Sequence, residues 1–377
     1  MKGARAAGAA LGLLLALLSG IPPLAADAVA LTSPTAATCI TDDGAVFTVE
    51  NGALRPVRGQ FMIFPTGGQE LHPRTAVSLD GEPGQLLKMF VWSAEPLDSM
   101  SIQVGTNGKS AFTKAVGFLA ESRQGIELWA ALVGIPPWSP PREYTLSLSA
   151  AAGQRSFLLM QPFTVSDRPF YSERIPLTAA LTDMATVPDE QKKTESRILA
   201  AVLATPHADA VFEKGAFIVP IPAARRTSGY GDRREYDYSD GTKGYSVHLG
   251  VDIASPIGTP VPACGQGRVV FAALRILTGN TVVVEHLPGL FSVYYHMSSI
   301  AVKVGDVVEK GQVIGAVGMT GFATGPHLHW EVEDTGVAVD PDALVRGPLL
   351  DKNADFFDID HAVAPKGGEF NSLYRSQ

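Results

Sequence analysis

Short apolar stretches separated by turn-forming clusters fill residues 32–165. Within each stretch apolar and polar residues alternate, as they do in strands with one buried face, and no helical period is present. The expected strands are Ala45–Glu50, Gly59–Phe64, Leu86–Trp92, Ile126–Leu132, Tyr144–Ser149 and Ser156–Met160. Regular spacing of this kind predicts an antiparallel β-sandwich, immunoglobulin-like in type. We expect an interaction or spacer module, since its lone histidine, His72, has no partner nearby in the sequence.

The next segment, residues 166–215, contains one helical pattern. Proline and acidic residues at Pro188–Glu190 suit a first helical turn. Apolar residues then recur at helical spacing, at Ile198, Leu199, Val202 and Leu203. The pattern predicts a connecting helix that packs its apolar stripe on a neighbouring domain.

Residues 216–346 are again rich in strand patterns, and residues 347–377 follow as a C-terminal tail. In this second region the expected strands are Pro260–Cys264, Arg268–Ala272, Thr281–His286, Ser292–His296, Gln312–Val317 and His329–Val332. The chain is therefore expected to be mainly β, with a second domain built on a small antiparallel sheet, two-layered or barrel-like, and a groove across one face. Because its strands are local, we expect a fragment beginning near Phe217 to fold alone.

One stretch of this region, Val304–Gly315, resembles the hairpins of biotinyl and lipoyl carrier domains. A carrier needs a lysine at an exposed hairpin tip, and Gly318–Gly321 contains none. We therefore retain the related hairpin fold and discard the carrier function.

The first 26 residues have the pattern of a secretory signal peptide. Lys2 and Arg5 precede an apolar run at Leu11–Leu18, and small residues follow at Ala26–Ala30. The run is short for a bilayer span of about 20 residues, which disfavours the alternative of a retained anchor. We expect an exported protein of the periplasm or cell envelope, with no membrane span in the mature chain.

Composition and charge narrow the class of partner. With 377 residues, 46% of them hydrophobic and 18% charged, the chain is long enough for two globular domains. Its net charge of -8 becomes about -10 once Lys2 and Arg5 are removed with the signal peptide. Such acidity argues against nucleic acid or an anionic membrane surface as the main partner.

The chain has two cysteines, so no framework of disulfides holds its fold together. Cys39 is not a convincing lipidation site, because Ala36–Thr38 lacks the leucine expected before a lipidated cysteine. For Cys264 we expect a buried free thiol, with a disulfide to Cys39 as the alternative in an exported protein.

Histidines and carboxylates concentrate in two short stretches. On a strand, His327, His329 and Glu331 would share one face, because alternate side chains point to the same side. The spacing of His248 and Asp252 suits either a strand or one helix face, so it leaves the local structure open. Two histidines and one aspartate suit zinc and leave a fourth position for water, as a catalytic site requires.

Five ordered blocks within residues 216–346 resemble the lysostaphin-type, LytM-like zinc endopeptidases, which cut peptide bonds in bacterial peptidoglycan. The matching blocks are Ser228–Arg234, His248–Asp252, Gly258–Ala263, Tyr294–Met297 and His327–His329. They cover about a third of the chain, and the remaining two thirds do not support the assignment. A long insert, Glu235–Val247, departs from the family pattern and is expected to reshape the substrate groove.

The resemblance implies one zinc ion per chain, held by His248, Asp252 and His329. It also implies that His327 is the general base and that His296 hydrogen-bonds the oxyanion or the attacking water, although these two roles could be exchanged. We further expect substrate contacts from Tyr230, Tyr294 and Asn280.

The expected function is an exported zinc endopeptidase that cuts stem peptides or cross-bridges of peptidoglycan. One alternative is a catalytically silent relative that binds the wall or activates another hydrolase. Silent relatives typically lose ligands or the His-x-His pair, whereas this chain has every position. The other alternative is a zinc peptidase that acts on proteins, because selectivity depends on groove shape.

Overall fold

The computed structural model describes residues 79–350, except 94–95, 107–110, 124–125 and 154, together with four strands before residue 66. These strands are β1 (Ala36–Ile40), β2 (Val46–Glu50), β3 (Ala53–Pro56) and β4 (Phe61–Pro65). The expected signal peptide, His72 and the chain after residue 350 lie outside the described residues. In the part that is described, no helix has the length and apolar character needed to cross a membrane.

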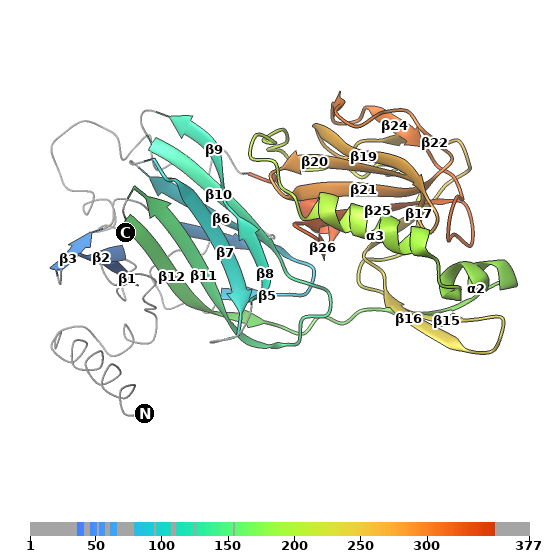
Figure 1. The fold of residues 1–377 in the computed structure, drawn as a ribbon, viewed down its shortest axis with the longest axis horizontal. Coiled ribbons are helices and arrows are strands. Elements are labelled where there is room, and N and C mark those ends of the chain that lie inside the picture. The colour runs from blue at the N-terminus through green and yellow to red at the C-terminus, as the bar shows by residue number, and fades with distance from the viewer. Residues whose placement is uncertain are drawn as a thin grey trace.

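The N-terminal lobe contains two facing sheets (Figure 1). Its further strands are β5 (Leu79–Gly81), β6 (Leu86–Ser93), β7 (Ser99–Gly105), β8 (Ala111–Val116), β9 (Phe118–Arg123), β10 (Ile126–Gly134), β11 (Arg142–Ala152) and β12 (Arg155–Val165). One sheet has the order β4-β6-β10-β9 and the other β5-β12-β11-β7-β8. Met89 and Val133 of the first sheet share a core with Ile102, Leu146 and Phe163 of the second. The described strands thus pack as two layers, and their immunoglobulin-like classification stays a prediction.

The C-terminal lobe is built on one large sheet of order β14-β17-β25-β21-β20-β19-β23, with β26 paired to β25. Its strands are β14 (Arg225–Ser228), β17 (Gly250–Ala254), β19 (Gly267–Arg275), β20 (Gly279–Leu287), β21 (Leu290–Met297), β23 (Val307–Val308), β25 (His327–Asp334) and β26 (Val337–Val339). All of its strand pairs are antiparallel, which agrees with the predicted mainly β, antiparallel fold.

Two smaller sheets and three helices complete this lobe. The helices are α2 (Ala179–Thr186), α3 (Glu190–Leu203) and α4 (Pro341–Val345). One smaller sheet has the order β18-β24-β22, with bounds Pro260–Pro262, Val313–Ala316 and Ser299–Ile300. The other has the order β13-β15-β16, with bounds Ser172–Pro176, Arg233–Asp237 and Lys243–Val247. We call this last one the small sheet; its hairpin β15–β16 is formed by the insert expected at Glu235–Val247.

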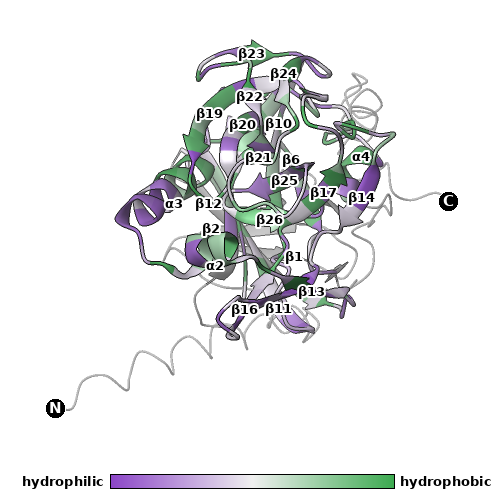
Figure 2. Cartoon of the chain, turned by 90° about the vertical axis from the view of Figure 1, so that its right-hand side faces the viewer, coloured by the Kyte–Doolittle hydropathy of each residue, from purple (hydrophilic) through white to green (hydrophobic). Residues whose placement is uncertain are grey.

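The predicted connecting helix is confirmed as α3, and α2 before it was not predicted. Asp189 caps α3 by accepting hydrogen bonds from the backbone N–H groups of Gln191 and Lys192, so Pro188 lies just outside the helix. Leu199 and Leu203 are buried against one face of the large sheet. Figure 2 looks onto the C-terminal lobe, with α3 at one side of the sheet and α4 at the other.

A hydrophobic core that is separate from the one within the N-terminal lobe extends across both lobes. Leu132 of β10 belongs to the same buried cluster as Val339 of β26. Beside it, the Gly134 N–H donates to Asp334 Oδ2 at 2.7 Å. Arg168 forms an ion pair of 2.6 Å with Asp340. This shared core argues against the expectation that a fragment beginning near residue 217 folds alone.

Candidate metal centre

Three neighbouring strands bring the central residues into one row. The Cα partner of Asp252 in β17 is His329 in β25, and the partner of His329 in β21 is Tyr295. The Tyr295 ring stacks on the His329 ring, with centroids 5.1 Å apart. The row lies on the same face of the sheet as the residues covered by α3, because Tyr295 packs with Leu199 and Leu203.

His248 completes the group from the turn before β17. Its Nε2 lies 3.1 Å from Asp252 Oδ1 and 2.9 Å from His329 Nδ1. His329 Nδ1 lies 3.0 Å from the same carboxylate oxygen. In a tetrahedral zinc site with bonds of about 2.0–2.1 Å, ligand atoms are separated by roughly 3.3 Å. The three donor atoms therefore fit a zinc ion after small shifts, and the N/N/O set suits that metal.

Hydrogen bonds to the outer nitrogens fix which nitrogen of each ligand faces the centre. His248 Nδ1–H donates to the Gly229 carbonyl at 2.7 Å, which leaves Nε2 for the centre. His329 Nε2 lies 3.4 Å from Glu331 Oε2, which leaves Nδ1 for the centre. A carboxylate or carbonyl behind a histidine ligand holds its tautomer and ring orientation. Sequence parity placed Glu331 on the correct face and assigned it no role.

Gly250 makes room for the His329 ring. A Cβ at this position would lie 2.4 Å from the Trp330 carbonyl oxygen and 2.8 Å from His329 Nε2. Only glycine fits so close to backbone without a shift of β25.

Charges inside the group are strongly coupled. Burial opposes a proton on His329, but hydrogen bonds to Asp252 and Glu331 outweigh burial and raise the pKa of His329 to about 9. Burial would also raise the pKa of Asp252, yet hydrogen bonds from His248 and His329 hold it well below its usual value. A metal ion would displace the proton between these groups, so its affinity depends on pH.

His327 and His296 lie beside the three donors, with ring centroids 4.8 Å apart. His327 Nδ1–H donates to the Gly325 carbonyl, and His296 Nδ1–H donates to the Thr320 carbonyl, each at 2.8 Å. In the neutral tautomer each ring therefore keeps an unprotonated Nε2. His327 Nε2 lies 3.6 Å from Asp252 Oδ1. Burial and the neighbouring histidines lower the pKa of His296 to about 3.

A bulge at the end of β21 determines which aromatic residue meets the centre. His296 has φ 61°, and the β20–β21 register shifts between Asn280 and Val282. Alternation is broken there, so His296 joins the face of Tyr295 rather than that of Tyr294. Tyr294 is fully buried, and its hydroxyl accepts from the Cys264 N–H at 2.8 Å. The expectation of a substrate contact from Tyr294 is thus wrong, because its ring belongs to the core.

The other two residues expected to contact substrate, Tyr230 and Asn280, have different surroundings. Tyr230 is 5% exposed, and its hydroxyl donates to the Ala338 carbonyl at 2.8 Å, beside Gly84 of the other lobe. The expected substrate contact from Tyr230 is therefore wrong, since the ring anchors the interface between lobes. Asn280 is half-buried, and its side-chain amide donates to the Met297 carbonyl at 2.9 Å. Its expected role stays a prediction.

Arg234 also contacts the centre, a role that was not predicted from the sequence. Its Nη2 donates to Asp252 Oδ2 at 2.5 Å, and its Nε donates to Glu173 Oε1 of β13 at 2.6 Å. Arg234 belongs to the Ser228–Arg234 block, but nothing in the spacing shows that β15 passes behind Asp252.

A second polar group, Cys264, His286 and Ser292, lies in the core. His286 Nε2 is 2.7 Å from Ser292 Oγ and 3.7 Å from Cys264 Sγ. All three side chains are fully buried. Burial raises the pKa of the Cys264 thiol to about 11 and lowers that of His286 to about 4. The group is inert and structural, and Cys264 is the predicted buried free thiol.

The sequence around the centre is similar to that of known peptidases. Residues 246–341 match Peptidase family M23, a stretch that contains all five residues expected at the centre. A metalloprotease of Buchnera aphidicola is 41% identical over 113 residues, 30% of each chain. The peptidoglycan DD-endopeptidase ShyA of Vibrio cholerae is 47% identical over 91 residues, 24% of this chain and 21% of the relative. Lysostaphin of Staphylococcus staphylolyticus is 35% identical over 141 residues, 35% and 28% of the two chains.

The match spans between 21% and 30% of the length of these curated relatives. Among solved structures, a peptidase M23 from Pseudomonas aeruginosa is 25% identical, with a TM-score of 0.44, and the match covers 70% of this chain and 93% of that one.

Proposed function

From the match of residues 246–341 to Peptidase family M23, we propose that the protein is an exported zinc endopeptidase that hydrolyses peptide bonds of peptidoglycan. The observation that carries the proposal is the convergence of His248, Asp252 and His329 beside two further histidines, each of whose Nδ1 atoms is hydrogen-bonded to a backbone carbonyl. Relatives named as peptidoglycan DD-endopeptidases support the substrate class. The signal-like N-terminus supports export.

His248 Nε2, Asp252 Oδ1 and His329 Nδ1 would hold the metal. Bound zinc would supply a water of lowered pKa and polarise the peptide carbonyl. His327 Nε2 accepts a proton from the attacking water and, once protonated, donates it to the leaving amine.

The tautomer of His296 refines its role. With Nδ1–H bound to the Thr320 carbonyl, neutral His296 has no N–H at Nε2 to donate to an oxyanion. Its low pKa keeps it neutral. We therefore assign His296 to orienting the attacking water by accepting a hydrogen bond, the second of the two tasks expected for it.

Mass spectrometry of muropeptides released from purified sacculi tests this function. The mature chain should release peptides whose new termini identify the bond, and a chelator should stop the release. Release that continues in chelator would contradict the metal mechanism. No release, together with cleavage of an unfolded protein substrate, would favour the protein peptidase, and no cleavage of either substrate would favour a silent wall-binding relative.

A further inference from the structure

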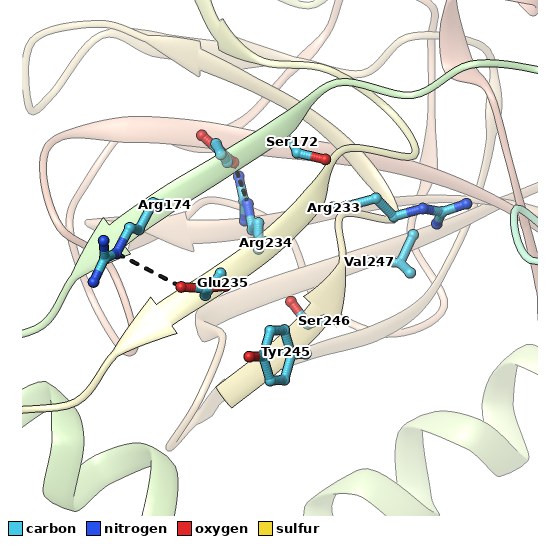
Figure 3. A pocket seen from close by; sticks show the side chains of 9 residues that line it. Ser172, Arg174, Arg233, Arg234, Glu235, Tyr245, Ser246 and Val247 are labelled. Atoms are coloured by element: carbon cyan, nitrogen blue, oxygen red, sulfur yellow. Dashed lines mark hydrogen bonds and ion pairs between the residues drawn. The ribbon is translucent and has the colours of Figure 1, made fainter. Parts of the chain in front are cut away.

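The small sheet has two faces with different neighbours. On one face Arg234 reaches Asp252 of the metal centre. A pocket of about 590 Å³ opens on the sheet, lined by Ser172–Arg174, Arg233–Glu235 and Tyr245–Val247 (Figure 3). In the strand register Arg174, Glu235 and Tyr245 form one row across it. Since side chains alternate along strands, this row lies on the face opposite Arg234.

Two of the three arginines that line the pocket are paired with carboxylates. Arg174 pairs with Asp237 at 2.5 Å and lies 3.6 Å from Glu235. Arg234 pairs with both Glu173 and Asp252. The pocket therefore offers planar hydrogen-bonding groups without a large excess charge that would select an ion.

Arg233 differs from the other two arginines. Among the described residues it has no carboxylate partner, and its Nη2 donates to the Pro137 carbonyl of the other lobe at 2.8 Å. Its guanidinium lies 4.6 Å from the centre of the Phe170 ring. Arg233 thus fixes the pocket at the junction of the two lobes.

Exposed aromatic residues occur in the segments that line the pocket or bond to Arg233. In the part of the chain that the structure describes, the strongly exposed aromatic residues are Trp138, Tyr171 and Tyr245, at 60%, 73% and 73%. Tyr245 lines the pocket. The Tyr171 carbonyl accepts from the Arg233 N–H at 2.8 Å, and Trp138 follows Pro137, which also accepts from Arg233. Single exposed apolar side chains are ordinary, but here one exposed aromatic residue lines a polar pocket and two more lie in the segments bonded to Arg233, which indicates a binding surface.

Sugars have the complementary chemistry. A pyranose ring presents a C–H face that packs on an aromatic ring, and its hydroxyl groups bond to guanidinium and carboxylate groups at its edge. We propose that this pocket, with Trp138, Tyr171 and Tyr245, binds the glycan chain of peptidoglycan. The inference rests on the proposed function, since it assigns a second part of the same substrate to this chain. An acidic peptide is the poorer fit because two of the three lining arginines already have carboxylate partners.

Titration of the full chain with N,N′,N″-triacetylchitotriose, followed by calorimetry, tests the site without catalysis. We expect saturable binding that a chelator does not change. Tyr245→Ala should weaken it by roughly 2- to 12-fold, as for loss of an aromatic contact, whereas Tyr245→Phe should retain it. Leu274→Ala is the matched control, because Leu274 is 68% exposed on β19 and does not line the pocket.

Absence of saturable sugar binding would overturn the inference, as would unchanged affinity in both Tyr245→Ala and Trp138→Ala. If the chain instead binds an acidic stem tripeptide, in a salt-sensitive manner, and does not bind the sugar, the ligand of the pocket is a peptide and the glycan assignment is wrong. Failure of this site is distinguishable from failure of the proposed function. Chelator-sensitive muropeptide release without sugar binding would contradict only the glycan site. Sugar binding without muropeptide release would contradict only the peptidase function.

Discussion

Asp252 uses its two carboxylate oxygens for different partners: Oδ1 faces His248 and His329, and Oδ2 accepts a hydrogen bond from Arg234 Nη2. The ion pair links a candidate metal ligand to the insert hairpin of the small sheet. It also holds the carboxylate in an orientation that presents one oxygen to the centre.

Replacing Arg234 should therefore weaken metal binding. We expect Arg234→Gln to lower zinc affinity by about 10- to 100-fold, the range for loss of an outer-sphere partner. Competition with a fluorescent chelator measures the affinity. Arg174→Gln is the matched control, because Arg174 is 65% exposed and pairs with Asp237 rather than with a residue of the centre. Equal zinc affinities in the Arg234→Gln and Arg174→Gln variants would mean that the Arg234 side chain does not contribute to metal binding by Asp252.

Glu331 is expected to hold His329 in the tautomer that binds metal. Glu331→Gln keeps an oxygen near His329 Nε2 but removes the charge, and we expect about a 10-fold loss of zinc affinity. Glu331→Leu should lose more, because no acceptor remains. A Leu variant that binds zinc like the unmodified chain would show that the 3.4 Å contact is incidental.

The His-x-His pair separates metal binding from chemistry. His329→Ala should lose zinc and activity together. His327→Ala should keep zinc and lose activity by roughly 10²- to 10⁴-fold, the contribution of a positioned base. Metal analysis and muropeptide release, measured on the same samples, make the comparison. Zinc loss in His327→Ala would reverse the two assignments.

Asp334 should make the stability of the folded chain depend on pH. Burial raises the pKa of Asp334 to about 8, from 3.8 in the unfolded chain, although the Gly134 N–H opposes the rise. The folded state then holds a proton that the unfolded state releases, so stability falls as pH rises from about 4 to about 8. The full effect is on the order of a few kcal/mol. Asp334→Asn removes the ionisation, and thermal unfolding at several pH values should show a flatter profile in that range. Parallel profiles for both proteins would contradict this assignment.

The shared core predicts that the C-terminal lobe is unstable alone. A fragment beginning at Phe217 lacks Leu132, α3 and β13, and should expose the apolar surface around Val339. We expect a lower melting temperature and weaker zinc binding than in a fragment beginning at residue 79. Equal melting temperatures would restore the view of an independent peptidase domain.

The part of the centre that could be predicted from the sequence follows from the regular alternation of side chains along a strand. His327, His329 and Glu331 share a face because β25 is an uninterrupted strand, and period-2 reasoning needs nothing more. In a regular strand Tyr294 and His296 would share a face, but the bulge at His296 breaks the alternation in β21, and Tyr294 lies in the core. A bulge leaves no clear mark in composition, so parity alone could not locate it.

Long-range packing explains the remaining misses. Tyr230 stands in a block shared with the family, yet its surroundings are set by Gly84 and Ala338, which are far away in sequence. Arg234 meets Asp252 only because the insert folds back as a hairpin paired with β13. Local pattern carries no information on such tertiary partners.

The parallel pairing of β13 with β15 has a mechanical consequence. β13 follows β12 of the N-terminal lobe and pairs along its length with β15 of the hairpin behind Asp252 (Figure 3). A force that separates the two lobes would therefore have to break this strand pairing and the shared core. The two lobes are thus held at a fixed separation, so a ligand bound to the N-terminal lobe would lie at a set distance from the candidate metal centre.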